Sequence, residues 1–176
     1  MAWTELEALK NTVLGVVAAH HAAAPLVIGV LAFLESLVVV SLFVPATTIL
    51  FGVGFLIAND TLMFWPVYFG AAAGAYLGDT VSYLLGFRFK RGIFRVWPLY
   101  RFPAMIFKGR TFFRRWGLAS VFIGRFFGPI RAVIPLIAGV FQMPWPVFQI
   151  SNISSALLWA LALLAPGMGL GWFLGD

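Results

Sequence analysis

Long apolar stretches alternate with short polar ones along this chain of 176 residues. Two of the stretches, residues 61–87 and 145–174, are each predicted to form a helix that crosses a bilayer, since a crossing takes about 20 residues. Two others, residues 25–58 and 117–143, carry prolines, glycines and charges within apolar sequence. Such interruptions favour a re-entrant helical hairpin, because broken backbone at membrane depth is tolerated only where protein buries it.

The two halves of the chain share a weak internal repeat. The tetrapeptide Trp65-Pro66-Val67-Tyr68 opens the first predicted crossing and recurs as Trp145-Pro146-Val147-Phe148 at the start of the second. Each unit would hold one re-entrant hairpin and one crossing, so successive units would run in opposite directions through the bilayer. The pattern therefore predicts an all-α integral membrane protein, an inverted repeat of re-entrant hairpin plus transmembrane helix, with amphipathic helices at the interface.

Small residues and prolines locate the breaks within the predicted hairpins. We expect the first hairpin to break at Pro45 and the second at Gly128 and Pro129. Residues 1–24 precede the first hairpin and lack the basic start and cleavage pattern of a signal peptide, so they predict an interfacial or partly inserted helix. Asn59 and Asp60 are expected to form a turn, with Asp60 capping the next helix.

Glycines and polar side chains predict contacts between helices. Gly70, Gly74 and Gly78 recur at every fourth position, which places them on one ridge and favours close approach of another helix; exposed functional backbone is the alternative. Five polar residues near or within the second crossing are expected to hydrogen-bond between helices. They are Gln142, Gln149, Asn152, Ser154 and Ser155.

Composition excludes a soluble domain, because 62% of the residues are hydrophobic, 10% are charged and the mean hydropathy is +0.98. The length leaves room for a single membrane domain. Nine of the 12 basic residues fall within residues 88–115. Such an excess of Lys and Arg is typical of a cytoplasmic loop, and the aromatic residues among the cations predict that residues 88–116 lie at the interface, against anionic lipid headgroups. Nucleic acid is not an expected partner.

Four ionisable residues interrupt the apolar segments: Glu35, Asp79, Arg125 and Arg131. Each costs about 2.5 to 3.5 kcal/mol at the centre of a membrane helix unless it is paired or reaches water. Two acids and two bases can pair, but the sequence leaves open whether Glu35 pairs with Arg125 or with Arg131. The chain has no cysteine and no recognisable catalytic or metal-binding motif, so no enzymatic activity, cofactor or metal is expected.

The two arginines are the candidate ligands of a substrate phosphate. A break at Gly128 and Pro129 can turn Arg125 and Arg131 into one cavity, and a guanidinium suits bidentate capture of phosphate. The alternative is structural: one arginine pairs with an acid and the other reaches the interface. Glu35 carries a removable charge and is the candidate for proton coupling, with Asp79 as a second candidate or a hydrogen-bond acceptor that faces the bundle.

The motifs that carry a family resemblance are Phe33-Leu34-Glu35-Ser36-Leu37 with Pro45 and Gly52 downstream, Gly74 through Gly78-Asp79 to Tyr83-Leu84-Leu85-Gly86, Gly124-Arg125-Phe126-Phe127-Gly128-Pro129-Ile130-Arg131, Ala138-Gly139, Met143-Pro144, Phe148 and Trp159. They resemble the DedA family of small bacterial membrane proteins, which share the VTT (SNARE-associated) domain. The resemblance covers about residues 25–159 and implies two opposed re-entrant hairpins. It also implies a role in moving lipid between leaflets, either recycling of undecaprenyl phosphate or phospholipid scrambling, often dependent on the proton motive force.

The resemblance carries functional roles onto Glu35, Arg125, Arg131 and Asp79. One departure concerns the first hairpin, where many members have an acid shortly after the proline but this chain reads Pro45-Ala46-Thr47. The second membrane carboxylate is therefore absent, which leaves Glu35 as the main residue for proton coupling.

The leading hypothesis is a multi-pass flippase of the bacterial inner membrane that moves a polyprenyl phosphate, with protons as a coupling ion. The first alternative is a phospholipid scramblase that needs no energy input. The second is a membrane scaffold in which the basic residues within 88–115 recruit anionic lipid or partner proteins. The oligomeric state, including a homodimer, is left open.

Overall fold

The computed structural model describes residues 12, 15, 22–37, 46–95, 99–101, 103–127 and 131–174. Throughout these residues the regular structure is helical, which confirms the predicted all-α class. The expected breaks at Pro45, Gly128 and Pro129, and most of residues 1–24, lie outside them. The helices are α2 (Ala24–Ser36), α3 (Ala46–Ala58), α4 (Phe64–Phe89), α5 (Pro103–Trp116), α6 (Ser120–Gly124), α7 (Val133–Val140) and α8 (Trp145–Leu174), with 3-10 turns η2 (Lys90–Arg95), η3 (Leu99–Arg101) and η4 (Gly117–Ala119).

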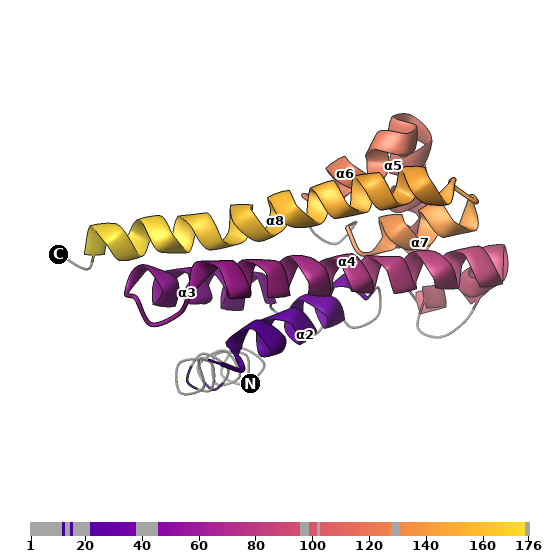
Figure 1. Ribbon diagram of the computed structural model, residues 1–176. Coiled ribbons are helices and arrows are strands. Elements are labelled where there is room, and N and C mark those ends of the chain that lie inside the picture. Colours follow the sequence, from indigo (N-terminus) through magenta and orange to yellow (C-terminus); the bar gives the residue numbers. More distant parts are fainter. Residues whose placement is uncertain are drawn as a thin grey trace.

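Two long helices, α4 and α8, form the axis of the molecule and run side by side in opposite directions (Figure 1). They have 26 and 30 residues, about 39 and 45 Å at 1.5 Å per residue, and both exceed a hydrocarbon core of about 30 Å. In the described part of the chain, one segment meets the length and hydropathy expected of a membrane span, Trp145–Gly169 of α8. The Trp-Pro pairs open α4 and α8, as the internal repeat predicts.

The glycine ridge of α4 is the surface on which α2 packs. A Cβ atom added at Gly74 would overlap the carbonyl oxygen of Gly29, and one added at Gly70 would overlap that of Pro25. At Gly78 the added atom would lie 2.6 Å from the carbonyl oxygen of Phe33. The predicted close packing is therefore confirmed, because the absence of side chains lets the two backbones approach.

Two further glycine crossings hold the other short helices against the long ones. Gly54 of α3 lies against Gly167 of α8, and a Cβ added at either would overlap backbone of the other helix. A Cβ added at Gly139 of α7 would overlap the backbone of α4 at Tyr83, and one added at Gly86 of α4 would overlap the backbone of α7 at Leu136. All residues of α7 are buried, with α5 covering its outer side. The helix α3 of the first half thus packs on α8 of the second half, and α7 of the second half packs on α4 of the first.

Two turns with the same hydrogen bonds connect short helices to long ones. After α3, the backbone N–H groups of residues 59, 60 and 61 donate to carbonyls four, three and five residues back, and residues 141, 142 and 143 do the same after α7. Asp60 and Gln142 occupy the left-handed position of these turns, with φ of 54° and 55°. Both turns are Schellman-like C-terminal caps.

The expectation that Asp60 caps the next helix was wrong. Asp60 belongs to the end of α3, where its left-handed backbone is tolerated by a short polar side chain. The residue that precedes α4 is Met63, which has extended backbone and no capping side-chain hydrogen bond. The turn itself lies where it was predicted, at Asn59 and Asp60.

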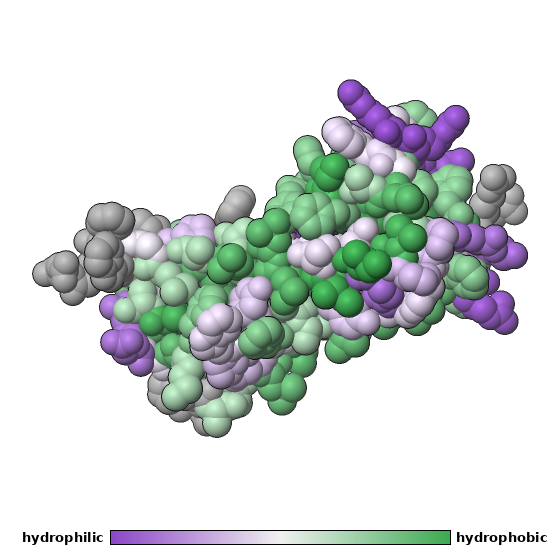
Figure 2. Space-filling view, turned by 45° about the horizontal axis from the view of Figure 1, so that its top comes forward, coloured by the Kyte–Doolittle hydropathy of each residue, from purple (hydrophilic) through white to green (hydrophobic). Residues whose placement is uncertain are grey.

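The basic segment, residues 88–116, contains η2, η3 and the amphipathic helix α5. Lys108, Arg110, Arg114 and Arg115 are exposed, whereas Ile106 is buried against α7. Figure 2 shows hydrophilic residues gathered mainly at the end that carries α5, while hydrophobic residues cover the middle of the visible face. An apolar middle with polar residues at one end is typical of a membrane protein.

We expect Gly74→Ala to lower the free energy of unfolding by about 1 to 3 kcal/mol, because the methyl group would push α2 away from α4. Gly169→Ala in α8 is the matched control, since a Cβ there meets nothing within 4 Å. Unfolding of the purified variants in mixed micelles measures both effects. Equal stability of the two variants would show that the α2–α4 contact is not close-packed.

Candidate functional site

The four charges within the apolar segments meet as two ion pairs. Arg125, directly after α6, pairs with Asp79 of α4. Arg131, just before α7, pairs with Glu35 near the end of α2, with 2.6 Å between Nη2 and Oε1. Glu35, Asp79 and Arg125 are each at most 6% exposed. The predicted pairing is confirmed, and the open question is answered: Glu35 pairs with Arg131.

The guanidinium of Arg125 is held by several acceptors besides Asp79. Its Nη1 donates to the carbonyl oxygen of Asn152 and to Oγ of Ser155, both at 3.1 Å. Its Nη2 donates to Asp79 and to the carbonyl oxygen of Ala75 at 3.3 Å. Because both terminal nitrogens already have acceptors, Arg125 joins the end of α6 to α4 and α8 and has little capacity left for a ligand.

The amide of Asn152 connects the same three elements. Its Nδ2 donates to the carbonyl oxygen of Tyr76 at 3.0 Å and to Oγ1 of Thr80 at 3.3 Å, while Oδ1 accepts from Arg125 at 3.4 Å. Asn152 is completely buried. A fully satisfied polar network of this kind fixes the rotation and height of α8 relative to α4.

The expectation of hydrogen bonds between helices holds for Asn152 and Ser155 but was wrong for Ser154, whose Oγ donates to Ile150 O of its own helix at 2.7 Å. Gln142 is exposed in its turn. The amide atoms of Gln149 are buried without a hydrogen-bond partner in the part of the chain that the structure describes.

Arg131 is bound less completely than Arg125. Its Nη2 contacts the side chain of Glu35 and lies 3.5 Å from the carbonyl oxygen of the same residue. Its Cζ lies 5.1 Å from the ring centroid of Trp159. Among the described residues, Nε and Nη1 of Arg131 have no acceptor, and the side chain is 14% exposed. These two nitrogens are therefore available to oxygen atoms of a ligand, and each has an N–H group parallel to one of Nη2, which contacts Glu35.

One face of α8 serves both arginines. Asn152, Ser155 and Trp159 are spaced i, i+3 and i+7, which places them on the same side of a helix. The first two contact Arg125 and the third contacts Arg131. The role of Trp159 was missed from the residues alone, although its helical spacing from Asn152 and Ser155 is a signal that could have indicated it.

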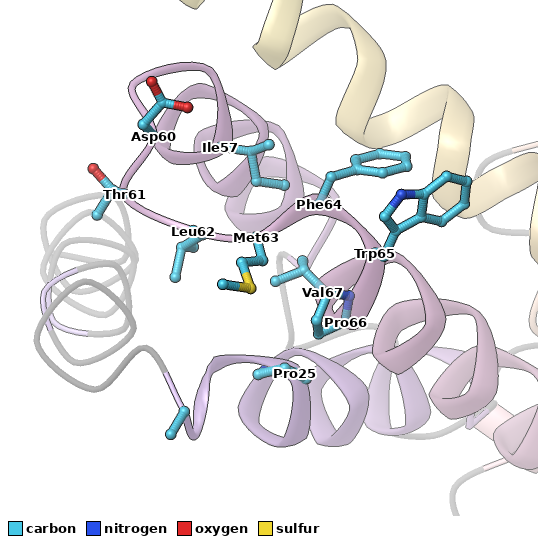
Figure 3. Close-up of a pocket in the computed structure, with 11 residues that line it drawn as sticks. Pro25, Ile57, Asp60, Thr61, Leu62, Met63, Phe64, Trp65, Pro66 and Val67 are labelled. Atoms are coloured by element: carbon cyan, nitrogen blue, oxygen red, sulfur yellow. The ribbon is translucent and has the colours of Figure 1, made fainter.

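A cavity of about 1020 Å³ lies apart from these charges, where α3 turns into α4 beside the start of α2 (Figure 3). Its lining is mostly apolar and includes Pro25, Met63, Trp65 and Pro66. Asp60 is the one charged residue in the described lining. The described lining of this cavity holds no cation, whereas the charged cluster holds two arginines, so we take the charged cluster as the candidate site.

Comparison with known proteins shows the family of the chain. A family model described as the VTT domain matches residues 44–168. The chain belongs to the VTT-domain (DedA) family. It is 35% identical over 137 residues to the inner membrane protein YabI of Escherichia coli, with 78% of this chain and 54% of YabI covered. The resemblance to the family is thereby confirmed, and the chain is a membrane protein.

Other relatives are named only as uncharacterized membrane proteins. BU139 of Buchnera aphidicola is 31% identical over 146 residues, which cover 83% of this chain and 57% of BU139. Rv2637 of Mycobacterium tuberculosis is 32% identical over 141 residues, which cover 77% of this chain and 63% of Rv2637. The chain spans about half the length of the first curated relatives it matches. No solved structure matches this member of the VTT-domain family.

We expect Asp79→Asn to destabilise the protein by about 3 kcal/mol, because it leaves the buried guanidinium of Arg125 without its counter-charge. Asp60→Asn, at an exposed turn, is the matched control and should change little. Adding Arg125→Met to Asp79→Asn should recover part of the loss, since the uncompensated charge is removed. Thermal unfolding in detergent compares the wild type with the three variants. An Asp79→Asn variant as stable as the wild type would contradict the structural role of the Asp79–Arg125 pair.

Proposed function

We propose that this VTT-domain protein carries a polyprenyl phosphate such as undecaprenyl phosphate across the bacterial inner membrane. The observation that carries the proposal is the partly occupied guanidinium of Arg131, with Nε and Nη1 lacking acceptors among the described residues. Arginine binds phosphate through two parallel N–H···O contacts, and such a pair would combine Nε or Nη1 with Nη2 once Glu35 leaves Nη2. Arg125, whose terminal nitrogens are occupied, takes the phosphate only if it leaves Asp79; otherwise it holds the end of α6 in place.

Glu35 supplies a means of binding and releasing the phosphate. In the resting site the carboxylate balances Arg131 at 2.6 Å. When a phosphate arrives, two anions would face one guanidinium in a buried place, which is costly unless one is neutralised or leaves. Protonation of Glu35 removes that conflict, and its deprotonation restores the ion pair and expels the phosphate. This exchange links transport to protons, with Asp79 as a further carboxylate beside the other arginine.

The proposed architecture is an inverted repeat of two re-entrant hairpins, each followed by a crossing helix. The helices α2 and α3 have 13 residues each, about 20 Å, which is too short to cross a core of about 30 Å. The matched turns at Asp60 and Gln142 and the reciprocal packing of α3 on α8 and of α7 on α4 support the repeat. Glu35, Arg125 and Arg131 would then lie near the hairpin tips, within reach of a headgroup from either leaflet.

The topology follows from the basic segment. We place residues 88–115 on the cytoplasmic side, with exposed cations of α5 against anionic lipid headgroups. Arg110 and Arg114 are exposed on α5, whereas Ile106 of the same helix is buried against α7. Such a contact would anchor α5, and through it the buried helix α7, at the interface.

A second candidate function is movement of ordinary phospholipid without energy input. It is favoured by Ala46-Thr47 after Pro45, where many family members have an acid. In that case Glu35 would balance Arg131 throughout the cycle. A scaffold that recruits lipid or protein through the basic segment is the outcome left if no lipid moves.

Translocation by purified protein in liposomes tests the proposal, with undecaprenyl phosphate and a fluorescent phospholipid measured side by side. We expect selective movement of undecaprenyl phosphate and at least a tenfold loss in Arg131→Ala, since a charge-assisted contact is worth about 1.5 to 3 kcal/mol. Asp60→Asn, at the exposed turn after α3, is the control. Equal movement of both lipids would indicate the scramblase, and an intact Arg131→Ala variant would refute the assignment of Arg131.

Proton coupling is tested by Glu35→Gln in the same liposomes under an imposed pH gradient. The amide keeps the size of the side chain but cannot exchange a proton, so we expect transport that no longer responds to the gradient. Wild-type transport should respond, and Asp60→Asn should behave like the wild type. A Glu35→Gln variant with an undiminished response would exclude Glu35 as the coupling residue.

A further inference from the structure

The guanidinium of Arg131 has two supports of different kinds. Glu35 offers a charge that a proton can remove, whereas Trp159 offers an aromatic ring 5.1 Å from Cζ. Cations within about 6 Å of a ring centroid are attracted by its electron-rich face, and Trp gives the strongest such contact. The ring of Trp159 lies in the core, at 4% exposure, where desolvation strengthens this attraction.

The two supports differ in what happens during a transport cycle. Arg131 lies in the turn before α7 rather than inside a helix, so its side chain depends on contacts for its position. If Glu35 were its sole support, neutralisation of that carboxyl would release the guanidinium at the moment when the phosphate must be bound. The attraction to the ring does not depend on protonation, and the ring offers no oxygen acceptor that competes with a phosphate for the N–H groups.

The position of Trp159 in α8 suits such a role. It lies on the same face as Asn152 and Ser155, which bind Arg125, so the network around Arg125 fixes the rotation of the face that presents the ring. Trp159 also packs within the main core formed by α2, α3, α4 and α8. The ring of Trp159 is therefore held in place by the core, while Arg131 belongs to the turn before α7.

We propose that Trp159 is the positioning residue of the site, and that its indole face holds the guanidinium of Arg131 in place while Glu35 gives way to the lipid phosphate. The inference rests on the proposed function of Arg131. It assigns to one aromatic ring the task of keeping Nε and Nη1 available to the ligand in both charge states of Glu35.

Fluorinated tryptophans placed at position 159 by site-specific incorporation provide the test, because fluorine withdraws electron density from the ring and nearly preserves its shape. Binding and translocation of undecaprenyl phosphate are measured in the same liposomes. We expect affinity to fall stepwise with each added fluorine, by roughly tenfold across the series, with unchanged thermal stability. The same series at Trp65, which is 65% exposed at the start of α4, is the control and should have no effect.

Conservative substitutions provide a second measurement. Trp159→Phe should retain part of the binding that Trp159→Leu loses, although both remain apolar. The loss caused by Trp159→Leu should be greater in a Glu35→Gln background, since the ring is then the main remaining support of Arg131. A smaller or equal loss there would overturn the inference.

The two proposals fail in different ways. If fluorination at position 159 changes nothing while Arg131→Ala still abolishes binding, Trp159 has no positioning role and the proposed function stands. If Arg131→Ala binds and moves undecaprenyl phosphate normally, the function assigned to Arg131 is wrong, and the inference about Trp159 falls with it.

Discussion

The ion pair between Asp79 and Arg125 is the contact on which the arrangement of the other elements depends. A single guanidinium in an apolar helical bundle is expensive to bury, so its acceptors must converge from several elements. Asp79 and Ala75 contribute from α4, and Asn152 and Ser155 contribute from α8. The end of α6, the middle of α4 and the first half of α8 are thereby tied together at one level of the molecule. These tied helices also carry the second ion pair, between Glu35 and Arg131, which we propose to open when a ligand binds.

Glycine crossings make this arrangement geometrically possible. Gly74 lets α2 lie directly on α4, and this approach brings the end of α2, with Glu35, to the level of the charged cluster. The hydroxyl of Ser82 donates to the carbonyl oxygen of Ser36 at 3.3 Å and secures the same helix end. Gly86 and Gly139 allow α7, the helix that follows Arg131, to approach α4 equally closely. Small residues thus replace the hydrophobic driving force that is weak between helices in lipid.

The unequal surroundings of the two arginines divide their roles. Arg125 has acceptors on both terminal nitrogens and holds the helices in place, while Arg131 contacts one carboxylate and one aromatic ring and has two nitrogens, Nε and Nη1, without a described acceptor. A site that must both bind and release a ligand, as we propose for this one, needs rigid surroundings, here the network of Arg125, and a ligand-binding group that protein acceptors do not fully occupy, here Arg131. The proposed exchange between Glu35 and a phosphate uses Arg131 alone, so the bundle need not come apart during a cycle.

The sequence by itself determined the helical class, the two long helices, the glycine ridge of α4 and the four residues whose charges had to be neutralised, because hydropathy and spacing are properties of local sequence. Only the tertiary structure decided that Glu35 pairs with Arg131, that Arg125 is saturated and that Trp159 faces the guanidinium. It also moved Asp60 from the start of α4 to the end of α3. Partners in a bundle depend on the rotation, tilt and height of helices far apart in the chain, and these are set by packing contacts that no local pattern encodes.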